Sequence, residues 1–501
     1  PADGGSTISQ VAGTSQTASQ INGCYQGGQL RNLRSQLLLA LGLATIISTS
    51  ISSSAHADAT NIVADRNAAA AQQAAILKSS NGTTQVNIQT PSKAGVSRNV
   101  FSQFDVGADG AILNNSRKNA QTQLAGWVEG NPYLARGEAR VILNEVNSSD
   151  PSRLSGYTEI AGGRAELVIA NPAGITCAGC GFINASRTTL TTGQALMDQG
   201  KLTGFDVTGG KVRIDGDGMD SMGSDYTQII AKTAEINAGI YAKNLDVITG
   251  SNQVSYEEEG ADTVVTANDS TSNNNATNNA TGVALDVSAL GAMYAGKIRL
   301  IGTDKGMGVT NAGSIVASAG GLQLDNNGNL INSGSLIANQ GKVNIVTKGF
   351  DVDNSGTIAS SRAGIDIDSA ALNNSGVVSS RDTLKLQQTG AINNSGEIAA
   401  GSFDMQSAAL KNSGKLLQTG TGNLAIDSSQ LLNKQGGIIG QDLYADASTP
   451  PSMPPSKTPP TTANNGSSVG TDDNSQPSEP NPTPLPSVTR DGSINVNNLT
   501  N

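Results

Sequence analysis

Residues 354–376 read NSGTIASSRAGIDIDSAALNNSG, and this stretch decides the fold. It begins and ends with the same Asn-Ser-Gly mark, and short runs with alternating apolar residues lie between the two marks. The mark or a close variant of it occurs seven times, beginning at Asn311, Asn332, Asn354, Asn374, Asn394, Asn412 and Asn433. The intervals are 21, 22, 20, 20, 18 and 21 residues. Self-similarity at about 20 residues, with short strands and glycine-containing turns, is typical of a β-solenoid.

The physical reason for such a fold is that one coil cannot bury enough apolar surface alone. Coils stacked about 4.8 Å apart let every strand pair with the strands above and below it. Asn residues at the same corner of successive coils can then form a ladder of side-chain amides. We therefore predict an all-β, parallel β-solenoid in which Ile345 and Ile367 point inward. A β-sandwich with recurring hairpins fits the regular intervals poorly.

The composition agrees with a thin, layered β architecture and narrows the classes of partner. The chain has 501 residues, of which 59 are glycine, and aromatic residues make up only 3%. Large apolar side chains supply most of the burial energy of a thick core, and here they are scarce. The formal net charge is −10, whereas nucleic-acid binding demands a basic surface. We expect no nucleic-acid partner and no cofactor.

The N-terminal region resembles an export signal in its pattern. Arg31 and Arg34 precede the apolar run 37–47, and an A-x-A pattern ends at Ala57, directly before Asp58. The run of eleven residues is too short to span a bilayer, which takes about 20 residues. We predict cleavage between Ala57 and Asp58; the alternative is a buried helix.

Cleavage would limit the chemistry of the mature chain. His56 is the single histidine and would leave with the signal, together with Cys24. Imidazole catalysis, a Ser-His-Asp triad and His-ligated zinc would then be excluded. Cys177 and Cys180 remain, and an exported chain meets an oxidising compartment. We predict a small disulfide loop and no metal site. A redox-active pair is the alternative, but it would normally lie at a helix N-terminus in a βαβ unit.

Two segments interrupt or end the predicted solenoid. Residues 266–281 form a polar, low-complexity stretch with almost nothing to bury, so we expect a mobile loop. Residues 448–487 hold eleven of the sixteen prolines. Because proline lacks the N–H that a strand ladder needs, the solenoid is expected to stop before them. The remainder of the chain, 448–501, is predicted to be a disordered linker or tail.

Several long runs make the N-terminal half similar to a known family. The runs 111–147 and 284–308, with the opening stretch, cover most of residues 60–310. They resemble the secretion domain of two-partner-secreted exoproteins, the class of filamentous haemagglutinin and the CdiA-like proteins of contact-dependent growth inhibition. The family's N-P-x-G-I motif corresponds to Asn171, Pro172, Ala173, Gly174 and Ile175, with Ala173 where Asn is commoner. Its N-P-x-L element corresponds to Asn131, Pro132, Tyr133 and Leu134.

The resemblance implies a fold and a route of export. It implies a right-handed parallel β-helix, export to the periplasm through the Sec machinery, and recognition by an outer-membrane barrel transporter with periplasmic POTRA domains. Such a chain crosses the barrel unfolded and folds outside, on the surface of a Gram-negative bacterium. The implied domains are a signal peptide at 1–57, a secretion domain at 58–310, shaft repeats at 311–447 and the tail at 448–501. The N-P-A-G-I motif is expected to fix a turn and to be read by the transporter.

The resemblance leaves the biological role open between an adhesin and a toxin-delivery stalk, with a receptor on a host or neighbouring cell. A β-helical enzyme of the pectate-lyase type is the alternative, but the coils lack a repeated acidic and basic cluster, so we predict no enzyme. A self-transporting protein would need its own barrel strands. Among single motifs, the carboxylates of residues 215–220 could form a calcium loop, although an exposed turn is favoured. Residues 257–259 are expected to be a solvated charge run, and Trp127 is expected to pack.

Overall fold

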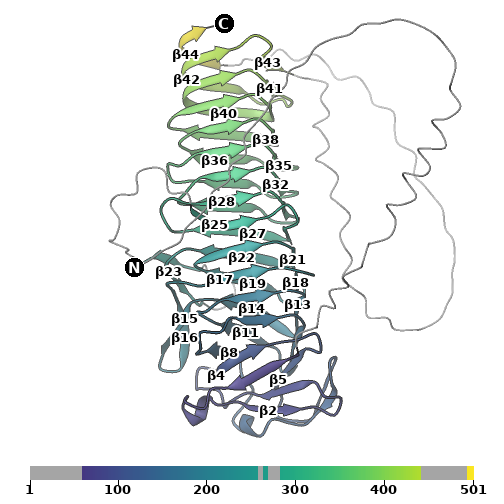
Figure 1. The fold of residues 1–501 in the computed structure, drawn as a ribbon. Helices are drawn as coiled ribbons and strands as arrows, with labels where there is room; N and C mark the ends of the chain where they lie inside the picture. The colour runs from purple at the N-terminus through teal and green to yellow at the C-terminus, as the bar shows by residue number, and fades with distance from the viewer. Residues whose placement is uncertain (1–58, 258–262, 269–281, 442–492, 501) are drawn as a thin grey trace, which may run out of the picture. The chain divides into compact units, whose positions relative to one another are not determined.

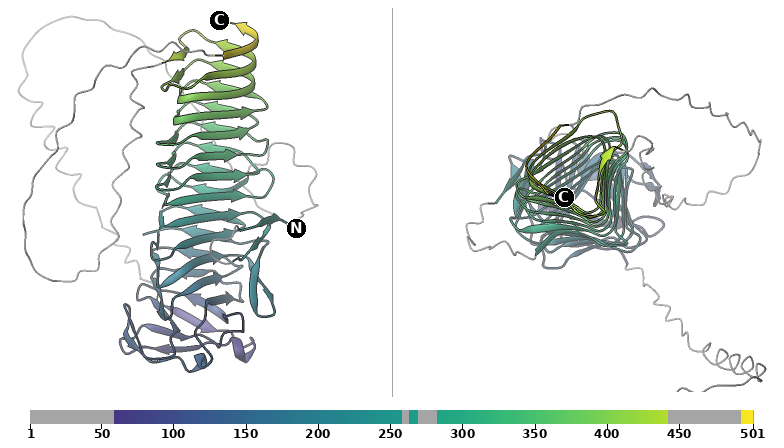
Figure 2. Two further views of the ribbon diagram at one scale, coloured as in Figure 1. Left: turned by 180° about the vertical axis from the view of Figure 1, so that it is seen from behind. Right: turned by 90° about the horizontal axis from the view of Figure 1, so that it is seen from above.

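The computed structural model describes residues 59–257, 263–268, 282–441 and 493–500 (Figure 1). Their strands stack into a parallel β-solenoid, and the view along its axis in Figure 2 shows the coils lying one above another around a common core. The prediction of an all-β parallel solenoid is confirmed. The only helices of the described residues are two single turns, η1 (Ala70–Gln72) and η2 (Pro132–Leu134). Within the same residues, no helix has the length and apolar character needed to cross a membrane. The predicted signal peptide, with Ala57 and Asp58, lies outside them.

Most coils contribute three strands, and each strand pairs in parallel with its counterparts in the next coils. The strands of the first coils are β3 (Thr84–Asn87), β4 (Val96–Asp105), β5 (Ala111–Asn115), β8 (Val141–Val146), β9 (Ser152–Leu154), β10 (Tyr157–Gly162), β11 (Ala165–Ala170), β12 (Ile175–Cys177), β13 (Cys180–Ile183), β14 (Ala185–Thr191), β17 (Lys211–Ile214), β18 (Met219–Ser221), β19 (Tyr226–Ala231), β20 (Thr233–Ile236), β21 (Gly239–Ala242) and β22 (Asn244–Thr249). The later strands are β25 (Gly282–Val287), β26 (Ala292–Ala295), β27 (Lys297–Gly302), β28 (Met307–Asn311), β29 (Ser314–Ala317), β30 (Leu322–Asn326), β31 (Leu330–Asn332), β32 (Ser335–Ala338), β33 (Val343–Val346), β34 (Val352–Asn354), β35 (Thr357–Ser360), β36 (Ile365–Ser369), β37 (Leu372–Asn374), β38 (Val377–Gln388), β39 (Ala391–Asn394), β40 (Glu397–Asn412), β41 (Lys415–Gln418), β42 (Leu424–Asn433) and β43 (Ile438–Gln441).

Inward-facing residues of successive coils align in columns and form one continuous core. Ile345 on β33 lies in register with Ile367 on β36, and both are buried in the core, as predicted. At one corner the seven mark residues form a ladder, because the Nδ2 of each Asn donates to the Oδ1 of the next Asn at 2.7–2.8 Å. The glycine of the mark is required by close stacking, since a Cβ on Gly356 would lie 2.0 Å from the carbonyl oxygen of Gly334. The repeat therefore encodes both the corner and its spacing.

The first coil is closed by antiparallel strands. β1 (Asn61–Ala64) runs antiparallel to β4, and β2 (Ala75–Lys78) forms a hairpin with β3. The purple segment at the end of the solenoid in Figure 1 is this cap. A cap of this kind covers the first coil, whose core would otherwise face solvent.

A second sheet lies on the outside of the solenoid, and we call it the cover sheet. It consists of β15 (Gln194–Asp198), β16 (Lys201–Val207), β23 (Asn252–Ser255) and β24 (Val265–Ala267), all antiparallel. The chain leaves the solenoid twice to build it, once after β14 and once after β22. The predicted mobile loop 266–281 is therefore wrong at its start, because Thr266 and Ala267 pair with β23. Residues 269–281 lie outside the described part of the chain.

A small hairpin of β6 (Ala120–Thr122) and β7 (Gly126–Val128) also packs on the outside of the coils. Val128 contacts the solenoid residues Ile112 and Ala161 from its inner face. Trp127 points the other way and is 67% exposed. The expectation that Trp127 packs is wrong, because alternate residues of a strand face opposite sides and Val128 takes the inner one.

The C-terminal end of the chain corrects the predicted tail. Residues 493–500 form β44 (Ser493–Thr500), which pairs in parallel with β42. Ile494 stands in register with Ile426, and Leu499 stands in register with Leu431. The tail prediction for 448–501 fails for these residues because their apolar pattern matches the strand beneath them. The proline-rich residues themselves lie outside the described chain.

Candidate functional site

The N-P-A-G-I motif forms the corner between β11 and β12. Asn171 is fully buried, and its Oδ1 accepts a hydrogen bond from the Ala173 N–H at 2.9 Å, which closes the turn. Its Nδ2 donates to the Asp150 carbonyl oxygen at 2.9 Å and to the Ser152 Oγ at 3.0 Å, both in the preceding coil. Its backbone N–H donates to the Thr191 carbonyl oxygen in the following coil at 2.9 Å. The side chain thus joins the turn to the preceding coil, and the backbone of the same residue joins it to the following one.

The other residues of the motif have distinct positions. Gly174 has a φ of +124°, which side-chain-bearing residues rarely adopt. Ile175 is buried in the core, in register with Ser152 and Val212 of the adjacent strands. Pro172 is exposed and Ala173 is partly exposed. At this corner only Pro172 and part of Ala173 are therefore accessible to solvent, while Asn171 and Ile175 face inward.

The N-P-Y-L element uses the same device earlier in the chain, directly before β8. Asn131 is 3% exposed and caps η2, its Oδ1 accepting from the Tyr133 N–H at 3.0 Å. Its Nδ2 donates to the carbonyl oxygens of Ile88 and Asn114 at 2.8 and 2.9 Å. Leu134 is fully buried, whereas Pro132 and Tyr133 are exposed. Both motifs place a buried Asn before an exposed proline, and in both the Asn side chain binds earlier coils.

The two remaining cysteines lie at the next corner, between β12 and β13. Cys177 and Cys180 are joined by a disulfide bond, and both face the core of the solenoid. Gly179 turns the chain between them with a φ of +98°. A disulfide buried inside a β-solenoid has none of the surroundings of a redox centre at a helix N-terminus.

The carboxylates of residues 215–220 are directed to separate partners. Asp215 Oδ1 accepts from the Asn237 Nδ2 at 2.8 Å, and Asp215 Oδ2 lies 3.1 Å from Arg213. Asp220 Oδ2 accepts from the Tyr157 hydroxyl at 3.0 Å. In the part of the chain that the structure describes, no group of three or more His, Cys, Asp or Glu side chains is placed to hold a metal ion.

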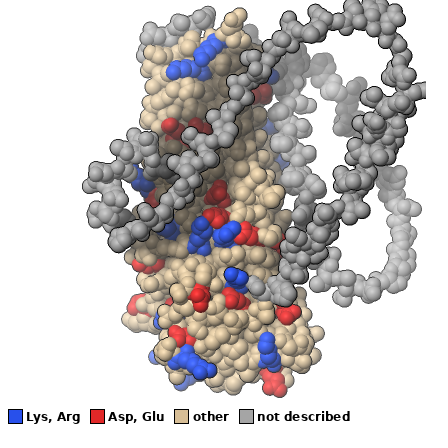
Figure 3. All heavy atoms as spheres, viewed as in Figure 1, with Lys and Arg blue, Asp and Glu red and all other residues tan. Residues whose placement is uncertain are grey.

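Of the predicted charge run, Glu257 is exposed. Figure 3 shows acidic and basic side chains interspersed over a largely uncharged surface.

Buried charge also fastens the β6–β7 hairpin to the coil beneath it. The Glu159 carboxylate accepts hydrogen bonds from the backbone N–H groups of Gln123 and Leu124, at 2.8–2.9 Å. Burial raises the pKa of Glu159, and the two N–H donors oppose that rise. The hairpin is therefore held by polar bonds as well as by its apolar inner face.

The sequence did not reveal a cluster that holds the cover sheet, which we call the latch. Tyr256, directly after β23, is 4% exposed and donates to Glu166 Oε2 at 2.6 Å. The Arg187 guanidinium lies 4.1 Å from the centre of the Tyr256 ring and donates to the Glu257 carbonyl oxygen at 2.8 Å. The available signal was Leu167-Val168-Ile169-Ala170, because a strand that is apolar at every position must be covered on both faces.

Comparison with known proteins gives one family and several relatives. The model of a family described as TPS secretion domain matches residues 60–332. The "Toxin CdiA" of Yersinia pestis is 55% identical over 304 residues, which are 60% of this chain and 8% of that protein. The "tRNA nuclease CdiA-2" of Burkholderia pseudomallei is 46% identical over 263 residues, 52% of this chain and 8% of that protein. The chain therefore spans only a small part of the length of these relatives.

Among solved structures, the chain is similar to the crystal structure of the filamentous hemagglutinin secretion domain. The identity is 27%, the match covers 64% of this chain and 99% of that one, and the TM-score is 0.48.

Proposed function

Because the chain belongs to the family of TPS secretion domains, we propose that its N-terminal coils direct export through a partner outer-membrane transporter and start the folding of the β-solenoid. Exoproteins of the CdiA and filamentous-haemagglutinin type are secreted by, or exposed on, Gram-negative bacteria, and this chain carries a secretion domain of that type. The match to a secretion domain favours this function over that of a polysaccharide-acting enzyme of the pectate-lyase type.

The observation that carries the proposal is the pair of buried asparagines. Asn171 and Asn131 each join a turn to earlier coils, so each corner is complete only when those coils are in place. Such bonds favour folding in the order of the chain, as export from one end requires. Because Asn171 is fully buried in the folded domain, its side chain is accessible to a transporter only before folding. The transporter therefore reads the unfolded motif, and the folded motif serves as a corner.

We infer the finer assignments from the resemblance to this family. The partner is a barrel transporter whose POTRA domains capture the chain in the periplasm after Sec export, with signal cleavage between Ala57 and Asp58. We propose residues 58–310 as the secretion domain and residues 311–447 as the start of a shaft; the family match continues to residue 332, across the first mark of the repeat and into the second. Relatives named toxin and tRNA nuclease favour a toxin-delivery stalk over an adhesin. The absence of enzyme activity and of nucleic-acid binding is proposed for these residues alone, since an effector region would be separate from them.

The test is secretion of an Asn171→Ala variant from cells that contain the transporter. Removing the amide leaves the buried Ser152 hydroxyl without its partner, which costs roughly 1–3 kcal/mol, and also removes the bond to the Asp150 carbonyl. We expect secretion to fall sharply and protein to accumulate or to be degraded in the periplasm. Asn423→Ala, at an exposed position of the shaft, is the matched control. Normal secretion of the Asn171 variant would overturn the proposal.

A further inference from the structure

The first coils have an apolar outer face, which is unusual for a solenoid in water. Outward positions normally carry polar residues, because alternate side chains of each strand face solvent. Here seven outward side chains are apolar and at most 3% exposed; they are Val96, Val141, Leu143, Val168, Ala170, Ile230 and Ile248. The same columns also contain three buried polar residues, which are Thr189, Thr191 and Gln228. An apolar patch on the outside of a protein marks an interaction surface, and in the folded chain the cover sheet occupies this one.

The extent of this face matches the extent of the cover sheet. Along one outward column, Ile230 is followed by Ile248, then by Ile301, and then by Asp325 in the next coil. The column changes from Ile to Asp where the cover ends. On the cover side, the packed residues are Leu202, Phe205, Val207, Val254 and Tyr256. The outer face is therefore built to be covered by a β-sheet.

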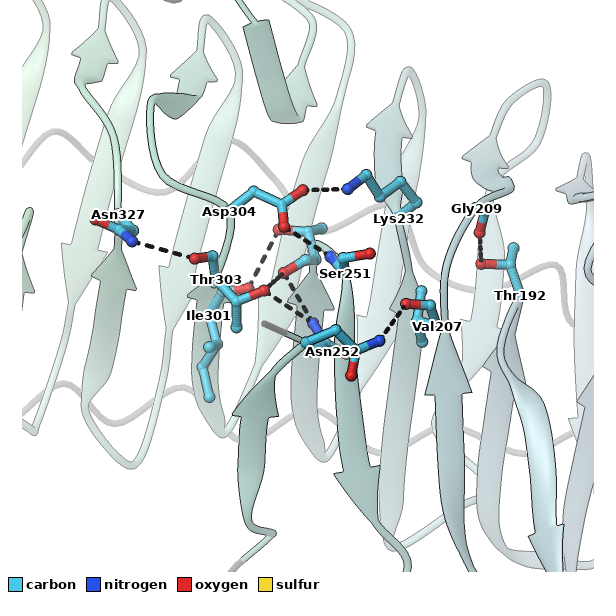
Figure 4. A network of polar contacts seen from close by, with 12 residues as sticks. Thr192, Val207, Gly209, Lys232, Ser251, Asn252, Ile301, Thr303, Asp304 and Asn327 are labelled. Carbon is cyan, nitrogen blue, oxygen red and sulfur yellow. Dashed lines mark hydrogen bonds and ion pairs between the residues drawn. The ribbon is translucent and has the colours of Figure 1, made fainter. Parts of the chain in front are cut away.

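The cover sheet is held at its base and at its tip. Figure 4 shows the base, where Thr192 Oγ1 donates to the Gly209 carbonyl oxygen at 2.7 Å and closes the first excursion. The second excursion begins where the Ser251 N–H donates to Asp304 Oδ1 at 2.8 Å, while Lys232 pairs with the other oxygen of Asp304. The tip is held by the latch around Tyr256, whose ring also packs edge-on against Phe205 with centroids 5.5 Å apart.

The order of the chain separates the face from its cover. The strands β4, β8 and β11 are complete at Ala170, but Asn252, the first residue of β23, lies 82 positions later. A chain that is held before folding, or that emerges from one end, exposes these apolar strands until β15 and β16 arrive, and the cover stays without its latch until residues 252–256 follow. β11 also leads directly into Asn171, the motif assigned to recognition.

We propose that the periplasmic part of the partner transporter binds these apolar strands before export and that closure of the cover sheet excludes it afterwards. This inference rests on the proposed function and adds the surface and the means of release to it. The partner must offer an apolar β-surface, because a β-sheet with apolar residues occupies the face in the folded protein. Closure makes binding one-way: the folded domain no longer presents the surface by which it was captured.

The test compares three forms of the full chain for binding to the purified periplasmic region of the transporter. The forms are wild type freshly diluted from urea, folded wild type, and a folded Tyr256→Ala/Phe205→Ser variant whose cover is loosened. If the cover is closed more than about 90% of the time, folded wild type binds at least roughly tenfold more weakly than the other two forms. Tyr256→Phe removes only the bond to Glu166 and gives an intermediate affinity, which keeps the test valid if the double variant fails to fold.

Tyr294→Ala is the matched control, because Tyr294 is partly buried on another face of the solenoid. Hydrogen exchange must show new exposure of residues 96–170 in the loosened variants and none in the control. Equal binding of folded wild type and the loosened variant overturns the inference. Binding of unfolded wild type alone also overturns it but leaves the proposed function standing, whereas no binding by any form removes both. Binding of a loosened variant to anionic lipid vesicles but not to the transporter assigns the face to a membrane instead.

Discussion

At the scale of single residues, buried asparagine side chains stabilise this protein. Asn374 accepts from Asn354 at 2.7 Å and donates to Asn394 at 2.8 Å, and it also donates to two backbone carbonyls. All amides of the ladder point the same way. The ladder begins at Asn311, whose buried Oδ1 has no partner because Val287 occupies the same position in the preceding coil. Each amide oxygen from Asn332 onward therefore accepts a hydrogen bond from the preceding Asn, whereas the oxygen of Asn311 has no Asn before it.

Asn374→Ala should lower the free energy of unfolding by about 3 kcal/mol, because it leaves several buried polar groups unpaired. The adjacent Asn373 faces outward, and Asn373→Ala should cost less than about 1 kcal/mol. Urea unfolding of the two variants measures the difference. Equal midpoints would contradict the structural role of the ladder.

Buried tyrosines should make the protein sensitive to alkali. Burial raises the pKa of Tyr226 to about 12, and the neighbouring Asp246 adds to the effect. Because the folded pKa lies above the unfolded value of 10, this contribution to stability is present below pH 10 and is lost as the pH rises towards 12. We expect unfolding free energy to fall over this range. Tyr226→Phe should weaken the dependence, and a melting series across the range would reveal an unchanged slope if the assignment is wrong.

Residue-level prediction from the sequence succeeded where the repeat is regular. The spacing of the marks located the buried Asn ladder and the inward Ile345 and Ile367. It failed at Trp127, because the strand of Trp127 belongs to a hairpin outside the coil. In this hairpin, the contacts with the coil beneath it decide which residues face inward.

At the scale of elements, the solenoid is modified by insertions at its corners. The β6–β7 hairpin and the cover sheet pack on its outside, and the disulfide lies at the corner that follows Asn171. The cover sheet could not be predicted from the sequence. Its two halves are far apart in the chain, and neither repeats with the period of the coils, so no local pattern joins them.

The disulfide should contribute modestly to stability. It closes a loop of four residues, and the loop-entropy relation gives about 2 kcal/mol for such a loop. We expect a Cys177→Ala/Cys180→Ala variant to keep its β circular dichroism and to unfold at a slightly lower urea concentration. Mass spectrometry of secreted protein should find the two cysteines linked. Loss of the fold would mean that the bond does more than constrain the unfolded chain.

At the scale of the whole molecule, stability is distributed along the stack. Each coil contacts only its neighbours, so damage should remain local. Ile367→Asp places a charge in the core of the shaft and should cost several kcal/mol. We expect hydrogen exchange to rise around β36 while the coils before residue 250 stay protected. Ile331→Asp, at a 48% exposed position, is the control. Exchange that rises throughout the chain would show that the solenoid unfolds as one unit.

The placement of β44 directly on β42 has a consequence for how this rod measures length. Residues 442–492 separate β43 from β44, yet no coil is added between β42 and β44. Residues 493–500 pair with residues 425–432 of β42, so the register of the stack resumes there. The length of the stack therefore depends on the number of coils and not on the number of residues between them. An insertion at a corner can lengthen the chain without changing the pairing of the strands that follow it.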